Sequence, residues 1–476
     1  MGYKTIVGLE IHVELMTKHK IFCNCPNEFG AEANTQTCPV CLGLPGALPV
    51  LDLEAIEYGI KAGLSFNSKI ADTIYMDRKN YFYTDLPKGY QISQDQNPLC
   101  KGGYLQVDLE DGESKKITLE RIHIEEDTGK QIHSEDGSLV DFNRAGVPLI
   151  EIVTNPDISS AEEARQFLEK LRMTLKYIGV SNVKMEEGSL RCDVNINILD
   201  EETGKKTNIS EIKNLNSFRG VGRAIEFEEK RHKKLLENGQ NTVRETRRWD
   251  DANNETIAMR VKAASADYRF AAEGDIPPIA IPKGLVDEIS DRLPELPQAK
   301  KNRLIKDYSI SEYDAGVLTQ SSEIADFFEE TIKHINDSQL VSNWVTGDVL
   351  RRLNDEDLEI EDLKFGPKAL ADLLKIVKDG KINNNTGKKV LREMFESGKE
   401  AQTIVEEKGL IQISDEGELE KILNNILDNN EQSIIDFKNG KDRALGFLVG
   451  QVMKETKGKA NPQVVNKLLK EELEKR

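Results

Sequence analysis

The chain has 476 residues, of which 38% are hydrophobic and 31% are charged, and its formal net charge is −18 at pH 7. This length suits two or three domains, each with its own hydrophobic core. No apolar run approaches the roughly 20 residues that span a bilayer, and a strand pattern begins at once, so we expect a cytosolic (cytoplasmic) protein without a membrane segment. The negative charge argues against broad, non-specific binding to nucleic acid but is compatible with a local basic patch.

The segment Thr5 to Leu15, "TIVGLEIHVEL", alternates between apolar and polar residues. A period of two predicts a β-strand with one buried face. The apolar side carries Leu9, Ile11, Val13 and Leu15, and the polar side carries Gly8, Glu10, His12 and Glu14. This polar side is either a hydrated surface or part of a site for a cation.

Four of the six cysteines lie close together in the sequence, at Cys23, Cys25, Cys38 and Cys41. In a cytosolic chain such a cluster indicates metal ligation before disulfides. Four thiolates around Zn²⁺ make a closed structural site that has no open position for catalysis. The alternative is four reduced or adventitiously paired thiols.

The stretch "DRKNYFYTDLPKGYQ" mixes cations with aromatic residues. Such a mixture fits phosphates and the faces of bases, and the alternative is a surface loop with snorkelling side chains. No P-loop motif occurs, so a nucleotide would be held in another way.

Further strand-like segments carry polar residues opposite apolar ones: "RIHIEED", "PLIEIV" and "SLRCDVNINI". Glu151 lies within an otherwise apolar run, where an unpaired charge is costly. If these strands share a sheet, one concave face gathers Glu10, His12, Glu125, Glu151 and Asp193. Oxygen ligands with an imidazole suit Mg²⁺ or Mn²⁺, whereas a hydrated outer face is the alternative.

A helix is expected over "SSAEEARQFLEKLRMTLKYIG", with Ser160 and Glu163 as a capping box and Gly179 at its end. Because strands and helices do not alternate regularly, we predict an α+β fold rather than a doubly wound sheet. The proline-rich segment 274–284 indicates a boundary, and nearly every later segment is helical. A second joint is expected near residue 409, and Asn461-Pro462 starts the last helix.

Several long segments resemble the GatB family, the B subunits of tRNA-dependent amidotransferases. They include "VGLEIHVEL", "CPVCLGLPGALPV", "DRKNYFYTDLPKGYQISQ", "HIEEDTGK", "DFNRAGVPLIEIVTNPD", "KMEEGSLRCDVNI", "EIKNLNSF" and "GFLVGQVMKETKGKANPQVVN". The resemblance covers essentially the whole chain. It implies a cradle-like mixed α/β catalytic domain over 1–292 with a zinc-binding insertion at 23–41, an all-α domain over 293–408 and a small YqeY-like, tRNA-binding helical tail over 409–476.

The resemblance also implies roles for individual residues. It implies Mg²⁺ or Mn²⁺ ligands at Glu10, His12, Glu125, Glu151 and Asp193, and structural zinc ligands at the four cysteines. Catalytic roles are expected for Glu125, Lys79, Lys88, Lys184 and Arg191, and contacts to ATP or substrate for Arg78, Asn80, Tyr81 and Asn195. In the tail, tRNA contacts are expected from Lys454, Lys457, Lys459 and Asn461, where a solvated helical face is the alternative.

The family's reaction converts misacylated aspartyl- or glutamyl-tRNA to the amide with ATP and ammonia. The chain has no Ser–Ser–Lys amidase segment, so ammonia is expected from an amidase A subunit, with a small C subunit completing a heterotrimer. Two other functions stay open from the sequence: a non-catalytic tRNA-binding scaffold, and a stand-alone carboxylate–amine ligase. Thr84 and the segment 270–274 depart from the family pattern.

Overall fold

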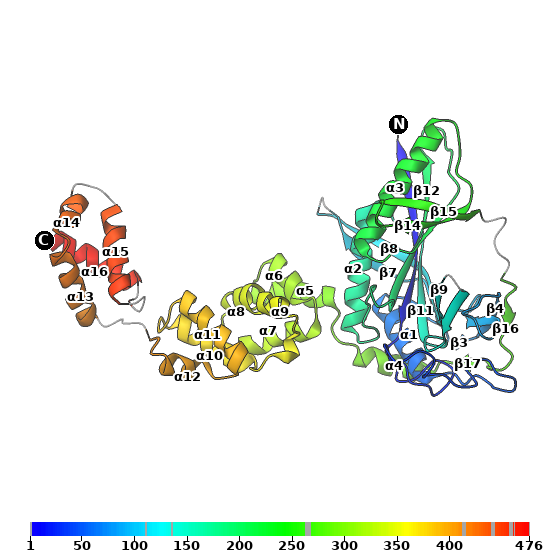
Figure 1. Cartoon of the computed structure of the whole chain (residues 1–476), viewed down its shortest axis with the longest axis horizontal. Coiled ribbons are helices and arrows are strands. Elements are labelled where there is room, and N and C mark those ends of the chain that lie inside the picture. The colour runs from blue at the N-terminus through cyan, green and yellow to red at the C-terminus, as the bar shows by residue number, and fades with distance from the viewer. Residues whose placement is uncertain are drawn as a thin grey trace. The chain divides into compact units, whose positions relative to one another are not determined.

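The computed structural model describes residues 2–109, 112–134, 137–261, 268–411, 416–438, 443–456, 460 and 462–475 (Figure 1). The chain divides into two units, Met1–Leu296 and Pro297–Arg476. The first unit mixes strands and helices and the second is helical, so the predicted α+β class is confirmed. The domain limits expected after residues 292 and 408 stay predictions.

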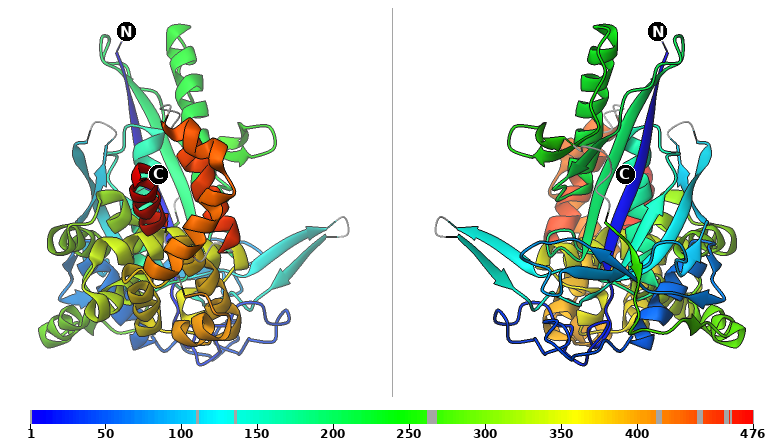
Figure 2. Two further views of the ribbon diagram at one scale, coloured as in Figure 1. Left: turned by 90° about the vertical axis from the view of Figure 1, so that its left-hand side faces the viewer. Right: turned by 90° about the vertical axis from the view of Figure 1, so that its right-hand side faces the viewer.

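The first unit is built on one large, mainly antiparallel sheet (Figures 1 and 2). Its strands are β1 (Tyr3–Glu14), β2 (Lys69–Ile70), β6 (Cys100–Lys101), β7 (Tyr104–Asp108), β8 (Ser114–Glu126), β11 (Pro148–Thr154), β12 (Leu190–Asp200), β13 (Ser210–Lys213), β14 (Glu245–Asp250) and β15 (Glu255–Val261). The order is β15-β14-β13-β12-β1-β11-β8-β6-β2, and β7 pairs with β8. Only β13 and β14 run parallel among the described pairs. The strand predicted from Thr5 to Leu15 is therefore central to the sheet.

Smaller sheets of two or three strands accompany the large sheet. They are β4 (Asp77–Asn80) between β5 (Tyr90–Ser93) and β16 (Ala271–Ala272), β3 (Thr73–Ile74) with β17 (Ile279–Ala280), and the projecting hairpin of β9 (Lys130–Ser134) and β10 (Gly137–Asp141), visible in Figure 2. The segment 270–274, which departs from the family pattern, thus includes a short strand that pairs with β4.

Helices cover the apolar face of the sheet. They are α1 (Leu53–Ser65), α2 (Ala161–Tyr177) and α3 (Phe218–Glu237), and α4 (Lys283–Arg292) packs against α1. Val7, Leu9, Ile11 and Val13 of β1 are at most 1% exposed on this face. Burying several such side chains, each worth about 1.5–3 kcal/mol, fixes which face of β1 points inward and therefore which face stays polar.

The predicted helix at 160–179 is present, but its capping box is only half right. Ser160 Oγ accepts a hydrogen bond from Glu163 N at 3.1 Å, as expected. The Glu163 carboxylate does not return to Ser160 but accepts from Ser159 N and from Lys115 Nζ, both at 2.8 Å. The ammonium group of Lys115 holds the Glu163 carboxylate beside Ser159, one residue before the expected partner Ser160. Gly179 follows the helix with a φ of +67°, as predicted for its end.

The second unit contains two separate hydrophobic cores among its described residues. The first core joins α5 (Pro297–Tyr308), α6 (Glu312–Leu318), α7 (Ser322–Ile335), α8 (Ser338–Trp344), the π-helical turn η1 (Val345–Val349), α9 (Leu350–Glu356), the 3₁₀ turn η2 (Ile360–Asp362), α10 (Pro367–Lys378), α11 (Asn384–Ser397) and α12 (Ala401–Glu407). The second joins α13 (Glu416–Asp428), α14 (Glu431–Lys438), α15 (Arg443–Glu455) and α16 (Pro462–Lys475). Within the described residues, no helix is long and apolar enough to cross a membrane.

A buried ionic network ties α3 to the sheet. The Glu228 carboxylate, fully buried, lies 3.1 Å from His232 Nε2 and 2.7 Å from Arg231 Nη2. Arg247 Nε of β14 is 3.2 Å from Glu228 Oε1. Burial alone would raise the pKa of Glu228, but hydrogen bonds from His232 and Arg231 lower it to about 2.

We expect Glu228→Gln to lower the free energy of unfolding at pH 7 by on the order of 3 kcal/mol, because it removes the negative charge that His232, Arg231 and Arg247 share in a buried position. A depressed carboxyl pKa stabilises the fold above the unfolded pKa and loses that effect as pH falls. The difference between parent and variant should therefore shrink between about pH 4.5 and pH 2. Urea unfolding at several pH values measures this difference, and the exposed Glu226→Gln is the control. A difference that does not change with pH would contradict the lowered pKa of Glu228.

Candidate functional site

Antiparallel register aligns four polar residues in a row across the large sheet. His12 of β1 is directly opposite Arg191 of β12 on one side and Glu151 of β11 on the other. Glu151 is in turn opposite His123 of β8. Directly opposite residues in a sheet point to the same face, so these four side chains lie side by side on the polar face.

Glu125, two residues after His123 on the same face of β8, approaches His12, His123 and Glu151 of this row. His12 Nε2 is 3.3 Å from Glu125 Oε1 and 3.4 Å from Glu151 Oε2. His123 Nε2 is 3.6 Å from Glu125 Oε2 and 3.3 Å from Glu151 Oε2. Ser93 Oγ, from β5, donates to Glu125 Oε2 at 3.1 Å. The polar faces of β1, β8 and β11 therefore form one tight group, which we call the His–Glu group: His12, His123, Glu125 and Glu151.

Burial makes the charges of the His–Glu group interdependent. Burial by itself lowers the pKa of His12, but the carboxylates of Glu151 and Glu125 outweigh it and raise that pKa to about 10. The same balance raises the pKa of His123 to about 9. Burial likewise raises the pKa values of Glu125 and Glu151, yet the two imidazoles bring both below the usual range. The two carboxylates thus require positive charge between them.

A divalent cation fits the His–Glu group. One ligand atom each from His12, Glu125 and Glu151 can be chosen so that all three lie within 4.8 Å of one another. His123 Nδ1 is buried and has no hydrogen-bond partner among the described residues, so this ring is held only through Nε2. Carboxylate oxygens with an imidazole nitrogen suit Mg²⁺ or Mn²⁺.

A second acidic group adjoins the first on the same face. Glu10, Asp193 and Glu211 can also place ligand atoms within 4.8 Å of one another. Asn195 Nδ2 donates to Glu10 Oε1 at 2.8 Å, and Lys213 Nζ contacts Asp193 Oδ2 and lies 3.1 Å from Glu211 Oε1. Burial, Glu151 and Asp193 raise the pKa of Glu10, while Asn195 and Lys213 oppose them. A lysine ammonium already supplies positive charge to this group.

The cations expected on this face form different pairs. Arg191 Nη2 donates to Asp127 Oδ2 at 2.6 Å, and Lys88 Nζ contacts both oxygens of Glu126. Arg191 lies beside the His–Glu group because it is opposite His12 in the register. Glu126 follows Glu125 along β8 and so points to the other face of the strand, where it holds Lys88. Lys184 Nζ instead lies 2.8 Å from Glu187 Oε1, in the loop before β12, and its side chain is half exposed.

The aromatic and basic segment 77–91 folds as the pair β4–β5 and its connecting loop. Arg78 is held by Glu273, with donor–acceptor distances of 2.7 and 2.8 Å, and lies over the Tyr90 ring. Lys79 Nζ is 4.8 Å from the centroid of the Tyr268 ring. These contacts fix β4 against the segment that includes β16.

Two other expected substrate contacts belong to the same segment. Asn80 Nδ2 donates to Arg269 O at 2.7 Å. Tyr81 packs edge-on against Tyr268, with 5.9 Å between the ring centroids. Burial, with the Asp85 and Glu125 carboxylates nearby, raises the pKa of Tyr81 above its usual value, so its hydroxyl stays neutral.

Two cavities are lined in part by residues of β1 and of the segment 77–91. One of about 450 Å³ is lined by Glu14, Phe29, Lys130 and Arg144, among others. Burial and the Asp127 carboxylate raise the pKa of Glu14 to about 8, although Arg191 and Arg144 act to lower it. A second cavity of about 260 Å³ is lined by Cys41, Gly43, Arg78, Lys88, Tyr90 and Glu126, among others. Both are large enough for parts of a substrate, and both lie within the first unit.

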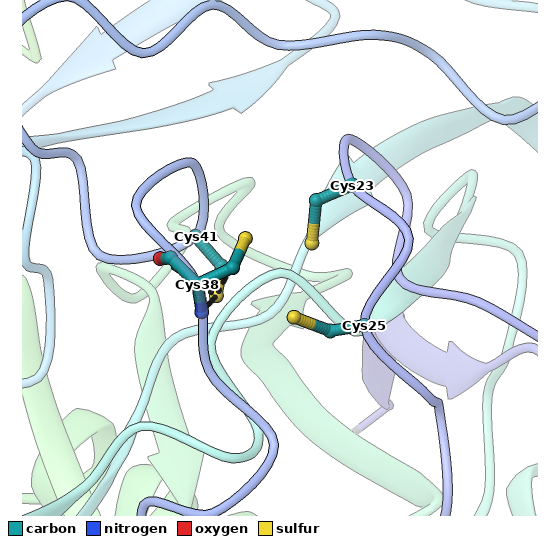
Figure 3. Close-up of side chains that lie close together, drawn as sticks. All are labelled: Cys23, Cys25, Cys38 and Cys41. Carbon is teal, nitrogen blue, oxygen red and sulfur yellow. Dashed lines mark hydrogen bonds between the residues drawn. The ribbon is translucent and has the colours of Figure 1, made fainter.

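The four cysteines come together as the sequence predicts (Figure 3). One Sγ from each of Cys23, Cys25, Cys38 and Cys41 lies within 4.8 Å of the others. The backbone N–H of Cys38 donates to Cys41 Sγ at 3.1 Å. Hydrogen bonding by Cys23, with Lys20 nearby, lowers the pKa of Cys41 to about 5, against the effect of burial. Four converging sulfurs fit the closed tetrahedral set that zinc prefers.

Comparison with known proteins shows which family the chain resembles. Residues 5–287 match the GatB/GatE catalytic domain, and residues 326–473 match the GatB domain. The B subunit of the aspartyl/glutamyl-tRNA(Asn/Gln) amidotransferase of Clostridium tetani is 54% identical over 475 residues, covering 100% of both chains. The B subunits of the same amidotransferase in two Clostridium botulinum strains, Okra and Hall, are 53% identical over the same length and coverage. The chain belongs to the GatB family.

Four further residues contact the candidate site residues, although the sequence patterns did not single them out. His123, Glu211, Lys213 and Asp127 contact the expected ligands and cations. The alternation in "RIHIEED" already placed His123 on the polar face, and "SEIKN" alternates in the same way, but the position of β13 beside β12 could not be read from the sequence. Lys454 is exposed on α15, and Lys457, Lys459 and Asn461 lie outside the described residues.

We expect Glu151→Gln to weaken Mn²⁺ binding by roughly tenfold or more, because divalent-ion affinity follows the number of charged ligands. The amide keeps the side-chain shape and removes one negative charge from between His12 and His123. Titration of the full-length protein with Mn²⁺, followed by electron paramagnetic resonance, measures the change. Glu120→Gln, exposed on the same sheet, is the matched control, and equal affinities for the two variants would count against the site.

Proposed function

We propose that this chain is the B subunit of a heterotrimeric amidotransferase, with an amidase A subunit and a small C subunit. Its substrate is misacylated aspartyl-tRNA(Asn), glutamyl-tRNA(Gln) or both, whose side-chain carboxylate it phosphorylates with ATP and then amidates. This makes it the ligating part of a carbon–nitrogen ligase that uses glutamine as the amide donor. The observation that carries the proposal is the His–Glu group on the polar face of the sheet.

The chemistry requires activation of a poor electrophile. A carboxylate carries negative charge and would have to expel oxide, so ammonia does not attack it directly. Its oxygen instead attacks the γ-phosphorus of ATP, the bond to the β-phosphate oxygen breaks, and ADP leaves. Ammonia then forms a C–N bond to the acyl phosphate while inorganic phosphate leaves. Both steps bring anions together, so positioning and neutralisation are the protein's main tasks.

Residues of the sheet fit these tasks. His12, Glu125 and Glu151 would hold Mg²⁺ or Mn²⁺, and Glu10 and Asp193 would extend the ligand set. The bound ion neutralises phosphate charge and orients the transferred group. Arg191, Lys88, Lys79 and Lys184 are assigned to phosphate and acyl-phosphate charge, and Arg78, Asn80, Tyr81 and Asn195 to ATP or substrate. Glu125 is also assigned either to take a proton from ammonium or to hold ammonia as it arrives.

The four-cysteine cluster is assigned to zinc in a structural role. The convergence of the sulfurs supports this assignment, and a closed thiolate set leaves no position for substrate. Glutamine hydrolysis is assigned to the A subunit, from which ammonia reaches the site without exposure to water. The helical tail is assigned to the tRNA backbone.

We expect Glu125→Gln to reduce tRNA-dependent ATP cleavage and amide formation by roughly 100-fold or more, because it removes a ligand and a proton acceptor together. The assay uses the purified three-subunit complex with misacylated tRNA, and tRNA binding is measured in parallel. An unchanged rate with intact tRNA binding would favour the scaffold alternative. Turnover of a small carboxylic acid without tRNA would favour a stand-alone ligase.

We expect removal of Lys457 and Lys459 by substitution with Met to weaken tRNA binding without abolishing phosphoryl transfer. The slope of log affinity against log salt should become shallower by about one for each lysine that meets a phosphate. Filter binding at several salt concentrations measures it. The double variant Lys18→Met and Lys69→Met, exposed in the first unit, is the control. Equal slopes for parent and tail variant would show that these lysines do not meet phosphate.

A further inference from the structure

A lysine lies buried against the four-cysteine cluster. Lys20 is 0% exposed and is among the largest fully buried side chains of the described residues. Its Nζ lies 3.8 Å from Cys41 Sγ and 3.2 Å from the carbonyl oxygen of Phe142. Among the described residues, no carboxylate lies within ion-pair distance of this ammonium. None of the roles assigned above uses Lys20.

An unpaired ammonium in this position would be costly. A buried charge needs an opposite charge and partners for its hydrogens, and one carbonyl satisfies a single donor of the three. The sulfur of Cys41 is the remaining polar neighbour, and a thiol is a poor acceptor without negative charge. The burial of Lys20 is therefore explained if the cluster carries negative charge. Four thiolates around one divalent ion carry such a charge.

We propose that Lys20 is the buried counter-charge of the metal-loaded four-cysteine cluster. Four thiolates and one Zn²⁺ leave an excess of negative charge, and the ammonium of Lys20 balances part of it from outside the ligand sphere. Through Phe142 O the same ammonium ties the turn that follows β10 to the segment 20–43, which we call the zinc loop. Lys20 is a positioning residue, because it acts on the metal through Cys41. This inference rests on the zinc assignment of the proposed function.

The zinc loop in turn supports one of the expected catalytic cations. Gly43, two residues after Cys41, has a φ of +63°, and a Cβ at this position would overlap Lys88 Cγ. The stem of Lys88 therefore packs directly on the loop while its Nζ contacts Glu126. Gly43 and Lys88 line the cavity of about 260 Å³ together with Cys23 and Cys41. A loosened cluster would alter this wall of the cavity.

The test compares Lys20→Met, which keeps the length and removes the charge, with Lys18→Met, which removes an exposed charge two residues away. Zinc per chain is measured by elemental analysis of the full-length protein, and zinc affinity by competition with a chromophoric chelator. We expect Lys20→Met to bind zinc about 10–100-fold more weakly, the usual effect of losing a group that supports metal ligands. Lys18→Met should match the parent, and Lys20→Arg should recover most of the affinity.

The outcomes separate the two assignments. A parent protein without zinc overturns the zinc site and this inference with it. A parent with zinc, and a Lys20→Met variant of equal affinity, overturns only the role of Lys20. If Lys20→Met does not fold, Lys20→Gln is loaded with Co²⁺ in place of zinc. Loss of the nearby charge should shift its thiolate-to-cobalt absorption to longer wavelength, and an unshifted band overturns the inference.

Discussion

The register of β1 between β11 and β12 is the constraint on which the site depends. It sets His12 opposite both Arg191 and Glu151, and Glu10 opposite Asp193. A slip of one residue would exchange the two faces of β1, placing Glu10 and His12 against the helices and Ile11 and Val13 in water. The buried apolar residues of β1 oppose that slip. The hydrophobic core therefore fixes the positions of the charged groups on the other side of the sheet.

Charge balance explains why those groups tolerate burial. Glu125 and Glu151 are 1% and 8% exposed, and each lies within 3.6 Å of both His12 and His123. Two carboxylates this close to each other raise each other's pKa unless positive charge separates them. Here the imidazoles provide it, and a divalent ion would provide the same charge in more compact form. In the second acidic group, Lys213 supplies the positive charge between Asp193 and Glu211.

The sequence predicted the faces of the strands better than their neighbours. Alternation along Thr5–Leu15 and Leu190–Ile198 assigned each residue to the correct face, because the period of two is local. It could not show that β13 pairs with β12, which brings Glu211 and Lys213 to the site, since pairing depends on contacts distant in sequence. The capping box failed in one half for a similar reason, because Lys115, far from Glu163 in the chain, competes for the carboxylate. The roles of the individual cations remain predictions, since ligands and partner subunits decide them.

Lys20 illustrates a limit of sequence patterns at the cysteine cluster. The spacing of the four cysteines indicates their ligands, but nothing in the run from Thr17 to Ile21 distinguishes Lys20 from the exposed Lys18. The difference arises only in the folded chain, where Lys20 is removed from water and its ammonium donates to the carbonyl oxygen of Phe142. Once water is excluded, an ammonium and a set of thiolates each become costly alone, and together they offset one another. Charged residues that are buried by distant parts of the chain can therefore be found only in the folded structure. This holds for Lys20 at the zinc loop and for the charged residues on the polar face of the sheet.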